Sequence, residues 1–173
     1  MKNNIIFVTG FFGAPVMQKA QQLAKEKGYA LISLDEEIEK ADGRSARRIC
    51  MMMGEHEYRN KEYEALKSIT ECALHEDQNC ALHENAGGKI PQGGLVVCCG
   101  DGVLHDDMSR ELIGAHELIV LGGDMTIDEL WENAREIKDS CHAFMHFGSD
   151  GEKRAAFEKL YERQRVLFTP YIN

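Results

Sequence analysis

The sequence has no apolar run that approaches the roughly 18 residues of a membrane-spanning helix. Its first ten residues, MKNNIIFVTG, lead directly into a predicted strand, without the apolar core of a cleavable secretion signal. We therefore expect neither a membrane span nor export, and we predict a cytoplasmic protein.

Positive charge is also scarce. The chain has 20 Lys and Arg against 29 Asp and Glu, a net charge of −9. A nucleic-acid or anionic-membrane surface needs clustered Lys and Arg, so both are excluded as expected partners. An acidic or phosphorylated ligand would have to be held by local arginines.

The six cysteines do not form an obvious disulfide framework. Without a secretion signal, reduced thiols are the expected state. Cys98 and Cys99 are adjacent in an apolar strand, and we expect Cys50 and Cys98 to pack as small hydrophobic residues.

Segments with strand and helix patterns alternate along the 173 residues. Strands are predicted at 5–8, 29–34, 95–99 and 118–121, and helices at 16–27, 36–40, 47–53, 55–69, 107–112, 126–138 and 152–164. This alternation predicts one α/β domain over residues 1–173, with a parallel sheet covered by helices on both faces.

A glycine loop joins the first strand to the first helix, which is the context of a phosphate-binding loop. The candidate phosphate-binding residues are Gly10, Phe11, Phe12, Gly13 and Ala14. A working loop of the form G-x-x-x-x-G-K-[ST] ends in Gly, Lys and Ser or Thr, whereas this chain has Pro15, Val16 and Met17. The alternative is a tight turn between a core strand and its helix.

Asp35 follows the second strand, where ligands of α/β proteins bind, although it could instead cap the next helix. Arg59 could pair with Glu62, one helical turn away, on a solvated face.

A small repeat contains Cys72-x-x-His75 and Cys80-x-x-His83. Four such ligands suffice for tetrahedral zinc, but the spacing matches no standard zinc module. We therefore predict no metal site, and we interpret residues 72–94 as an extension with a local duplication.

Five stretches carry a resemblance to a known family: NIIFVTGFFGA, LISLDEEIEKADGRS, GEHEYRNKE, LVVCCGDGVL and GEKRAAFEKLYERQ. In this order and at this spacing the chain resembles the shikimate kinases, which have a P-loop fold like that of the nucleoside monophosphate kinases. The resemblance implies that fold, and it implies ATP- and magnesium-dependent 3-phosphorylation of shikimate in aromatic amino acid biosynthesis.

The resemblance also implies a partly intact substrate site. Asp35 matches the family aspartate that holds shikimate hydroxyls and could act as the catalytic base, and Glu62 matches the acid that orients a carboxylate-binding arginine. The residues matched to substrate binding are Asp35, Tyr58, Arg59, Gly100, Asp101 and Arg163, or Arg165 in another helix register. Asp101 replaces a family glycine and would repel an anionic substrate.

The nucleotide side departs further from the family. Val16 stands at the P-loop lysine, and Met17 stands at the magnesium-binding hydroxyl. Ser33 replaces the first aspartate of D-x-D, and His142 stands at the arginine of a lid predicted at 141–151. The resemblance stops at Asn173, so we expect a C-terminally truncated fold in which residues 166–168 are a remnant of a further strand.

Losing one preorganised donor to a developing charge costs roughly 3–4 kcal/mol, and here several such groups are replaced. We therefore predict a catalytically impaired homologue that binds a shikimate-like small molecule and uses ATP and magnesium only if it is active. One alternative is an active small-molecule kinase in which Lys19, His142 or His146 compensates. The other is a non-catalytic interaction or regulatory module.

Overall fold

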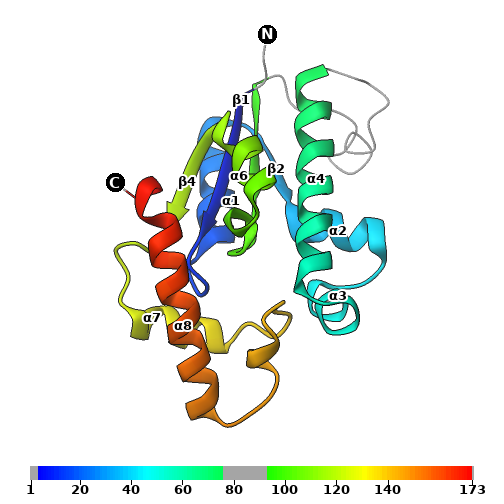
Figure 1. Ribbon diagram of the computed structural model, residues 1–173. Helices are drawn as coiled ribbons and strands as arrows, with labels where there is room; N and C mark the ends of the chain where they lie inside the picture. Colours follow the sequence, from blue (N-terminus) through cyan, green and yellow to red (C-terminus); the bar gives the residue numbers. More distant parts are fainter. Residues whose placement is uncertain (1–3, 76–92, 173) are drawn as a thin grey trace.

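The computed structural model describes residues 4–75 and 93–172. Its centre is a parallel sheet of four strands in the order β2-β3-β1-β4 (Figure 1). The strands are β1 (Asn4–Gly10), β2 (Ala30–Ser33), β3 (Gly94–Cys98) and β4 (Glu117–Leu121). The predicted parallel α/β architecture is therefore confirmed.

Seven α-helices and three short 3-10 helices connect or follow the described strands. The α-helices are α1 (Val16–Lys27), α2 (Leu34–Asp42), α3 (Ala46–Met53), α4 (Glu55–His75), α6 (Asp107–Gly114), α7 (Ile127–Arg135) and α8 (Asp150–Phe168). The 3-10 helices are η1 (Val103–His105), η2 (Ala143–Met145) and η3 (Thr169–Tyr171). Ser45, Thr126 and Ser149 begin their helices as side-chain caps. The last of these helices begins at Asp150, two residues before its predicted start.

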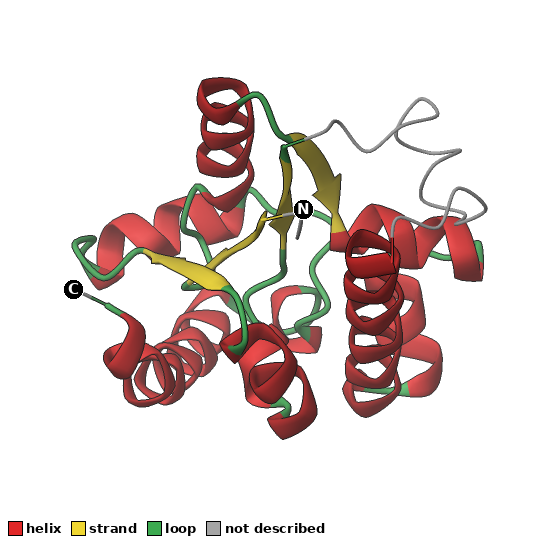
Figure 2. Ribbon diagram, turned by 90° about the horizontal axis from the view of Figure 1, so that it is seen from above, coloured by secondary structure: helices red, strands yellow, loops and turns green. Residues whose placement is uncertain are grey.

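Helices cover both faces of the sheet, as Figure 2 shows. The side chains of β1 alternate between the faces. Ile6 and Val8 pack in a cluster with Leu23 of α1, whereas Phe7 packs in a second cluster with residues of α4, α6, α7 and α8. Because its central strands β1 and β3 are buried, the sheet holds the loops at its carboxyl edge in fixed positions.

Residues 166–168, expected as a strand remnant, are helical and form the last turn of α8. Phe157, Leu160, Gln164 and Phe168 are all buried, at spacings of three and four residues. Because this periodicity places one face of the helix against the core, the helix continues to Phe168.

The expectation of reduced cysteines is wrong for Cys50, Cys72 and Cys141, all of which are disulfide-bonded. Cys50 forms its disulfide with Cys141. The two residues are 91 positions apart in sequence, and the fold brings their Cα atoms to 5.6 Å. The bond joins α3 to the segment between α7 and η2, a proximity that no local pattern indicates. Cys98 and Cys99 are free and buried, as expected.

Two further expectations concern membranes and metals. Among the described helices, none is long and apolar enough to cross a membrane. No group of three or more His, Cys, Asp or Glu side chains within residues 4–75 and 93–172 is arranged to hold a metal ion. Most of the Cys-x-x-His repeat lies outside the described residues, so its interpretation stays a prediction.

Candidate functional site

A cavity of about 270 Å³ lies where β1, β2 and β3 end. In a parallel sheet this carboxyl edge is where loops converge and ligands bind. The walls come from the loop after β1, the starts of α2 and α4, the turn after β3 and the segment before η2. The polar and charged lining residues are Ser33, Asp35, Tyr58, Arg59, Glu62, Asp101, Asp139 and Ser140.

Asp35 faces this cavity from the first turn of α2. The cap of α2 is Ser33, whose hydroxyl accepts from the Glu36 N–H, so Asp35 is not the helix cap. The Tyr58 hydroxyl donates a hydrogen bond to Asp35 Oδ1. Partial desolvation at the cavity wall raises the pKa of the Asp35 carboxyl, although the residue keeps an exposed surface and the bond from Tyr58 acts in the opposite direction.

Arg59 enters the same cavity from α4 and is held by two glutamates. Its Nη1 donates to Glu62 Oε2 at 2.5 Å, and its Nη2 donates to Glu55 Oε1 at 2.9 Å. The predicted pairing with Glu62 is present, but it is not on a solvated face, since Glu62 is only 1% exposed. Burial raises the pKa of Glu62 to about 7, despite the opposing charge of Arg59.

The Gly100-Asp101-Gly102 turn after β3 brings the backbone close to these side chains. A Cβ atom on Gly100 would lie 3.3 Å from Glu62 Oε1 and 3.6 Å from Asp35 Oδ1. A Cβ atom on Gly102 would lie 2.0 Å from Arg59 Nη2, so only glycine leaves room for the guanidinium. Gly100 was predicted as a site residue and Gly102 was not, although the G-D-G pattern contains both.

Asp101 is the centre of a buried polar network. Its Oδ2 lies 2.7 Å from His142 Nε2 and accepts from Gln164 Nε2 at 2.7 Å. Burial alone would raise the pKa of Asp101, but the charge and hydrogen bond of His142, together with Arg59, lower it to about 2. Asp101 in turn raises the pKa of His142, although burial opposes this. The carboxylate is thus paired with a residue from the predicted lid.

The structure does not bring Arg163 into the cavity. Arg163 lines a separate surface hollow with His105 and Val166, and Arg165 pairs with Glu162 on the surface. The α8 residue directed at the site is Gln164, which the sequence analysis passed over. The apolar residues Phe157, Leu160 and Phe168 mark one face of the helix, and Gln164 lies on that same face. Their spacing in the sequence could have identified Gln164 as an inward-facing residue.

The candidate phosphate loop makes its own hydrogen bonds. The N–H of Phe11 donates to Leu121 O, that of Ala14 to Phe11 O and that of Val16 to Ala14 O, at 2.8–3.0 Å. The Phe12 N–H donates to Gln164 Oε1 at 3.0 Å.

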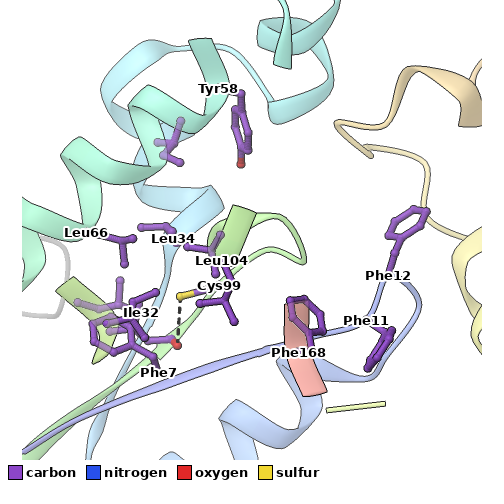
Figure 3. Close-up of a cluster of buried hydrophobic side chains, with 14 of the residues drawn as sticks. Phe7, Phe11, Phe12, Ile32, Leu34, Tyr58, Leu66, Cys99, Leu104 and Phe168 are labelled. Atoms are coloured by element: carbon purple, nitrogen blue, oxygen red, sulfur yellow. Dashed lines mark hydrogen bonds between the residues drawn. The ribbon is translucent and has the colours of Figure 1, made fainter. Parts of the chain in front are cut away.

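The aromatic side chains of this loop are fixed as well. Phe11 packs against Phe168 (Figure 3), and Phe12 packs against His142. Both phenylalanines are less than 5% exposed. Val16 and Met17 contribute to the cavity wall.

None of the three residues considered as substitutes for the missing cations lines the cavity. His142 is bound to Asp101, and His146 Nε2 lies 2.8 Å from Ser140 O. Lys19 lines a different hollow with Gln22 and Asp124. Within the described residues, Arg59 is the only Lys or Arg that lines the cavity.

The Asp101–His142 pair predicts a pH dependence of stability. His142 has a raised pKa, so its contribution is complete below its ordinary value of 6.5 and is lost as the pH rises through the folded value. Asp101 has a lowered pKa, so its contribution is present above 3.8 and is lost as the pH falls towards 2. Between these pH limits we expect the pair to contribute about 1–3 kcal/mol to the free energy of unfolding.

The measurement is urea unfolding of the wild type and of His142→Asn from pH 5 to pH 8.5. Because Asp35 and Glu62 also have raised pKa values, both proteins should lose stability as the pH rises. The free energy of unfolding of the wild type should fall further than that of His142→Asn, and the difference should equal the contribution of the Asp101–His142 pair. Parallel curves would show that His142 is not charged in the folded protein.

Residues 18–75 match the family model for shikimate kinase. The chain is 40% identical over 118 residues to a shikimate kinase of Chlorobium limicola, covering 68% of this chain and 49% of that protein. It is 30% identical over 167 residues to a shikimate kinase of Chloroherpeton thalassium, covering 96% of this chain and 75% of that protein.

Two solved structures share the fold. A shikimate kinase from Acinetobacter baumannii in complex with shikimate gives a TM-score of 0.72 at 17% identity, over 97% of this chain and 79% of that one. A shikimate kinase from Bacteroides thetaiotaomicron gives a TM-score of 0.73 at 18% identity, over 96% of this chain and 82% of that one. The chain spans about half the length of the first curated relatives that it matches.

Proposed function

The chain belongs to the shikimate kinase family, and on this basis we propose that it is a small-molecule-binding homologue that has lost efficient phosphoryl transfer. The observation that supports the proposal is the hydrogen bonding of the backbone N–H groups in the loop at residues 10–14. Phosphate binding by such a loop depends on free backbone N–H groups, and those of Phe11, Phe12 and Ala14 are already hydrogen-bonded within the chain.

The family's cofactors, ATP and magnesium, do not fit the residues that are present. Val16 offers no cation where the family lysine would neutralise a phosphate, and the thioether of Met17 is a poor ligand for a hard metal ion. Pro15 has no N–H to donate. We therefore assign no step to a bound nucleotide. Each missing donor is expected to lower the rate of phosphoryl transfer by about 10²- to 10³-fold.

The other half of the cavity supports binding of a hydroxylated ring. Asp35 offers carboxylate oxygens beside Tyr58 and Gly100, and hydroxyl groups pair well with such acceptors. The cavity, about 270 Å³, is smaller than the roughly 300–1,000 Å³ of drug-sized sites, so its ligand is a molecule of about one ring. The Acinetobacter baumannii relative binds a ring of this kind, shikimate.

Isothermal titration calorimetry tests this function. We expect no heat with ATP and magnesium up to millimolar concentration, and we expect a saturable signal with a ring polyol such as shikimate or an inositol. Asp35→Asn should weaken that binding at least tenfold. The matched control is Asp124→Asn, an exposed acid outside the cavity, which should leave binding unchanged.

Two results would contradict the proposal. Micromolar ATP binding together with ADP release in the presence of shikimate would indicate a working kinase. Silence with every ring polyol would indicate an interaction or regulatory module instead. The triple variant Pro15→Gly, Val16→Lys and Met17→Ser then asks whether the loop side chains alone prevent ATP binding, because it leaves the Phe12–Gln164 bond in place.

A further inference from the structure

The cavity is bordered by a covalent cross-link. Ala46 begins α3 and lines the cavity, and Cys50 follows one helical turn later on the same face of that helix. Cys50 is bonded to Cys141, which lines the cavity from the segment between α7 and η2. The disulfide therefore joins two walls of one cavity, and these walls cannot separate while the bond is intact.

The wall that contains Cys141 has no regular structure of its own. Residues 136–142, all of which the structure describes, form neither helix nor strand. Ser140 lines the cavity beside Cys141, and His142 is bonded to Asp101 in the turn after β3. Segments without regular structure open at a lower cost in free energy than packed helices and strands. The covalent bond to α3 therefore limits how far this wall can open.

The disulfide is accessible to a reductant. Cys50 and Cys141 are both partly exposed, and the three methionines at 51–53 are 47–67% exposed. A dithiol attacks one sulfur of such a bond and forms a mixed disulfide, and its second thiol then releases the protein. The protein gains two electrons and two protons, its S–S bond becomes two thiols, and the dithiol leaves as a disulfide.

Two free cysteines line the same cavity where β3 ends. Cys98 is 8% exposed, and Cys99 is 3% exposed. Burial raises the pKa of Cys98 to about 12 and raises the pKa of Cys99 well above its ordinary value. Because a thiolate is the reactive form, both thiols are inert while the cavity is closed, and their alkylation reports its opening.

We propose that the Cys50–Cys141 bond controls access to the cavity through its redox state. As a disulfide it keeps the wall at residues 136–142 against α3, and reduction by a dithiol allows this wall to open. This inference goes beyond the proposed function, because it concerns access to the cavity and not the identity of the ligand.

Alkylation by iodoacetamide, followed for each cysteine by mass spectrometry, tests the proposal. The double variant Cys50→Ser/Cys141→Ser lacks the bond and adds no free thiol. We expect Cys98 and Cys99 of this variant to react at least tenfold faster than those of the oxidised wild type. Wild-type protein reduced with dithiothreitol should react like the variant, and reoxidation with oxidised glutathione should restore the slow rate.

A matched control removes the other disulfide. Cys72 is also disulfide-bonded, but it lies more than three turns beyond Arg59 on α4 and does not line the cavity. Cys72→Ser should therefore leave the alkylation rates of Cys98 and Cys99 unchanged. Acceleration by the same factor as in the double variant would overturn the proposal, because it would show that the effect is not specific to the bond at the cavity.

Urea separates an opening of the wall from unfolding of the whole domain. The dependence of a reaction on urea increases with the protein surface that must be exposed. Below the unfolding transition, we expect the alkylation rates of the double variant to depend only weakly on urea. Rates that rise as steeply as the unfolding equilibrium constant would overturn the proposal, because the bond would then act only on overall stability.

The remaining outcomes distinguish this inference from the proposed function. Equal alkylation rates in the double variant and the oxidised wild type would reject redox control of the cavity and leave the ligand-binding proposal intact. Absence of binding for every ring polyol would reject the proposed function, whereas the alkylation rates would still decide whether the disulfide controls access.

Discussion

Arg59→Met is expected to lower the free energy of unfolding by about 3–5 kcal/mol. The substitution leaves the Glu62 carboxylate, which is 1% exposed, without its cation. An unpaired buried charge is far more costly than the loss of a surface ion pair, because no water replaces the missing partner. Urea unfolding at pH 9, well above the pKa of about 7 that Glu62 has in the wild type, measures the change.

A lower pH should reduce the effect of Arg59→Met. Glu62 has a pKa near 7 with Arg59 present, and removing the guanidinium raises that pKa further. At pH 5.5 the carboxyl of the variant takes up a proton and no longer requires a cation. A loss of stability that is equal at both pH values would show that Glu62 is not the cause.

Two further variants control this experiment. Arg165→Met removes an exposed pairing with Glu162 and should cost at most about 0.5 kcal/mol. The double variant Arg59→Met/Glu62→Leu removes both charges and should recover most of the stability. If Arg59→Met costs less than the surface control, the Arg59–Glu62 pair is solvated in the folded protein.

Gln164→Leu is expected to lower the free energy of unfolding by about 2–4 kcal/mol. Its amide joins two parts of the site, since Oε1 accepts from the Phe12 N–H and Nε2 donates to Asp101 Oδ2. Leucine is similar in size but leaves a buried N–H without an acceptor and Asp101 with one donor fewer. Urea unfolding gives the change in stability, and hydrogen exchange at Phe12 reports the freed N–H directly.

Gln164→Glu separates the two bonds. A carboxylate at this position still accepts from the Phe12 N–H, but it cannot donate to Asp101 unless it is protonated. The variant should therefore be less stable than the wild type at pH 8, and its stability should recover towards pH 5. Gln22→Leu, on the exposed face of α1, is the control for losing a glutamine. Unchanged stability in Gln164→Leu would mean that the loop does not depend on α8.

Much of the fold follows from local pattern. The apolar stretches of β1 and β3 are buried on both faces, and this composition is typical of central parallel strands. The start of α7 was predictable because Thr126 precedes acidic residues, and the same pattern at Ser149 marks the start of α8, which was predicted two residues too late. Residues 166–168 were predicted as a strand remnant because a run of three apolar residues is compatible with a short strand and with the end of a helix.

The candidate site was only partly predictable. Asp35, Tyr58, Arg59 and Gly100 do meet in one cavity, because they follow strands or begin helices at the same edge of the sheet. Arg163 was predicted as a site residue but lies outside the cavity, since a shift of one residue rotates a helical side chain by about 100°. That rotation directs Gln164 into the site and Arg163 away from it.

The sequence by itself determined the parallel α/β fold, its family and the absence of a lysine and a hydroxyl from the glycine loop. These properties depend on residue type and on order along the chain. Only the tertiary structure decided the Cys50–Cys141 bond, the pairing of Asp101 with His142 and the bond from Phe12 to Gln164. These contacts join residues 41 to 152 positions apart, and such pairings depend on how the helices pack against the sheet.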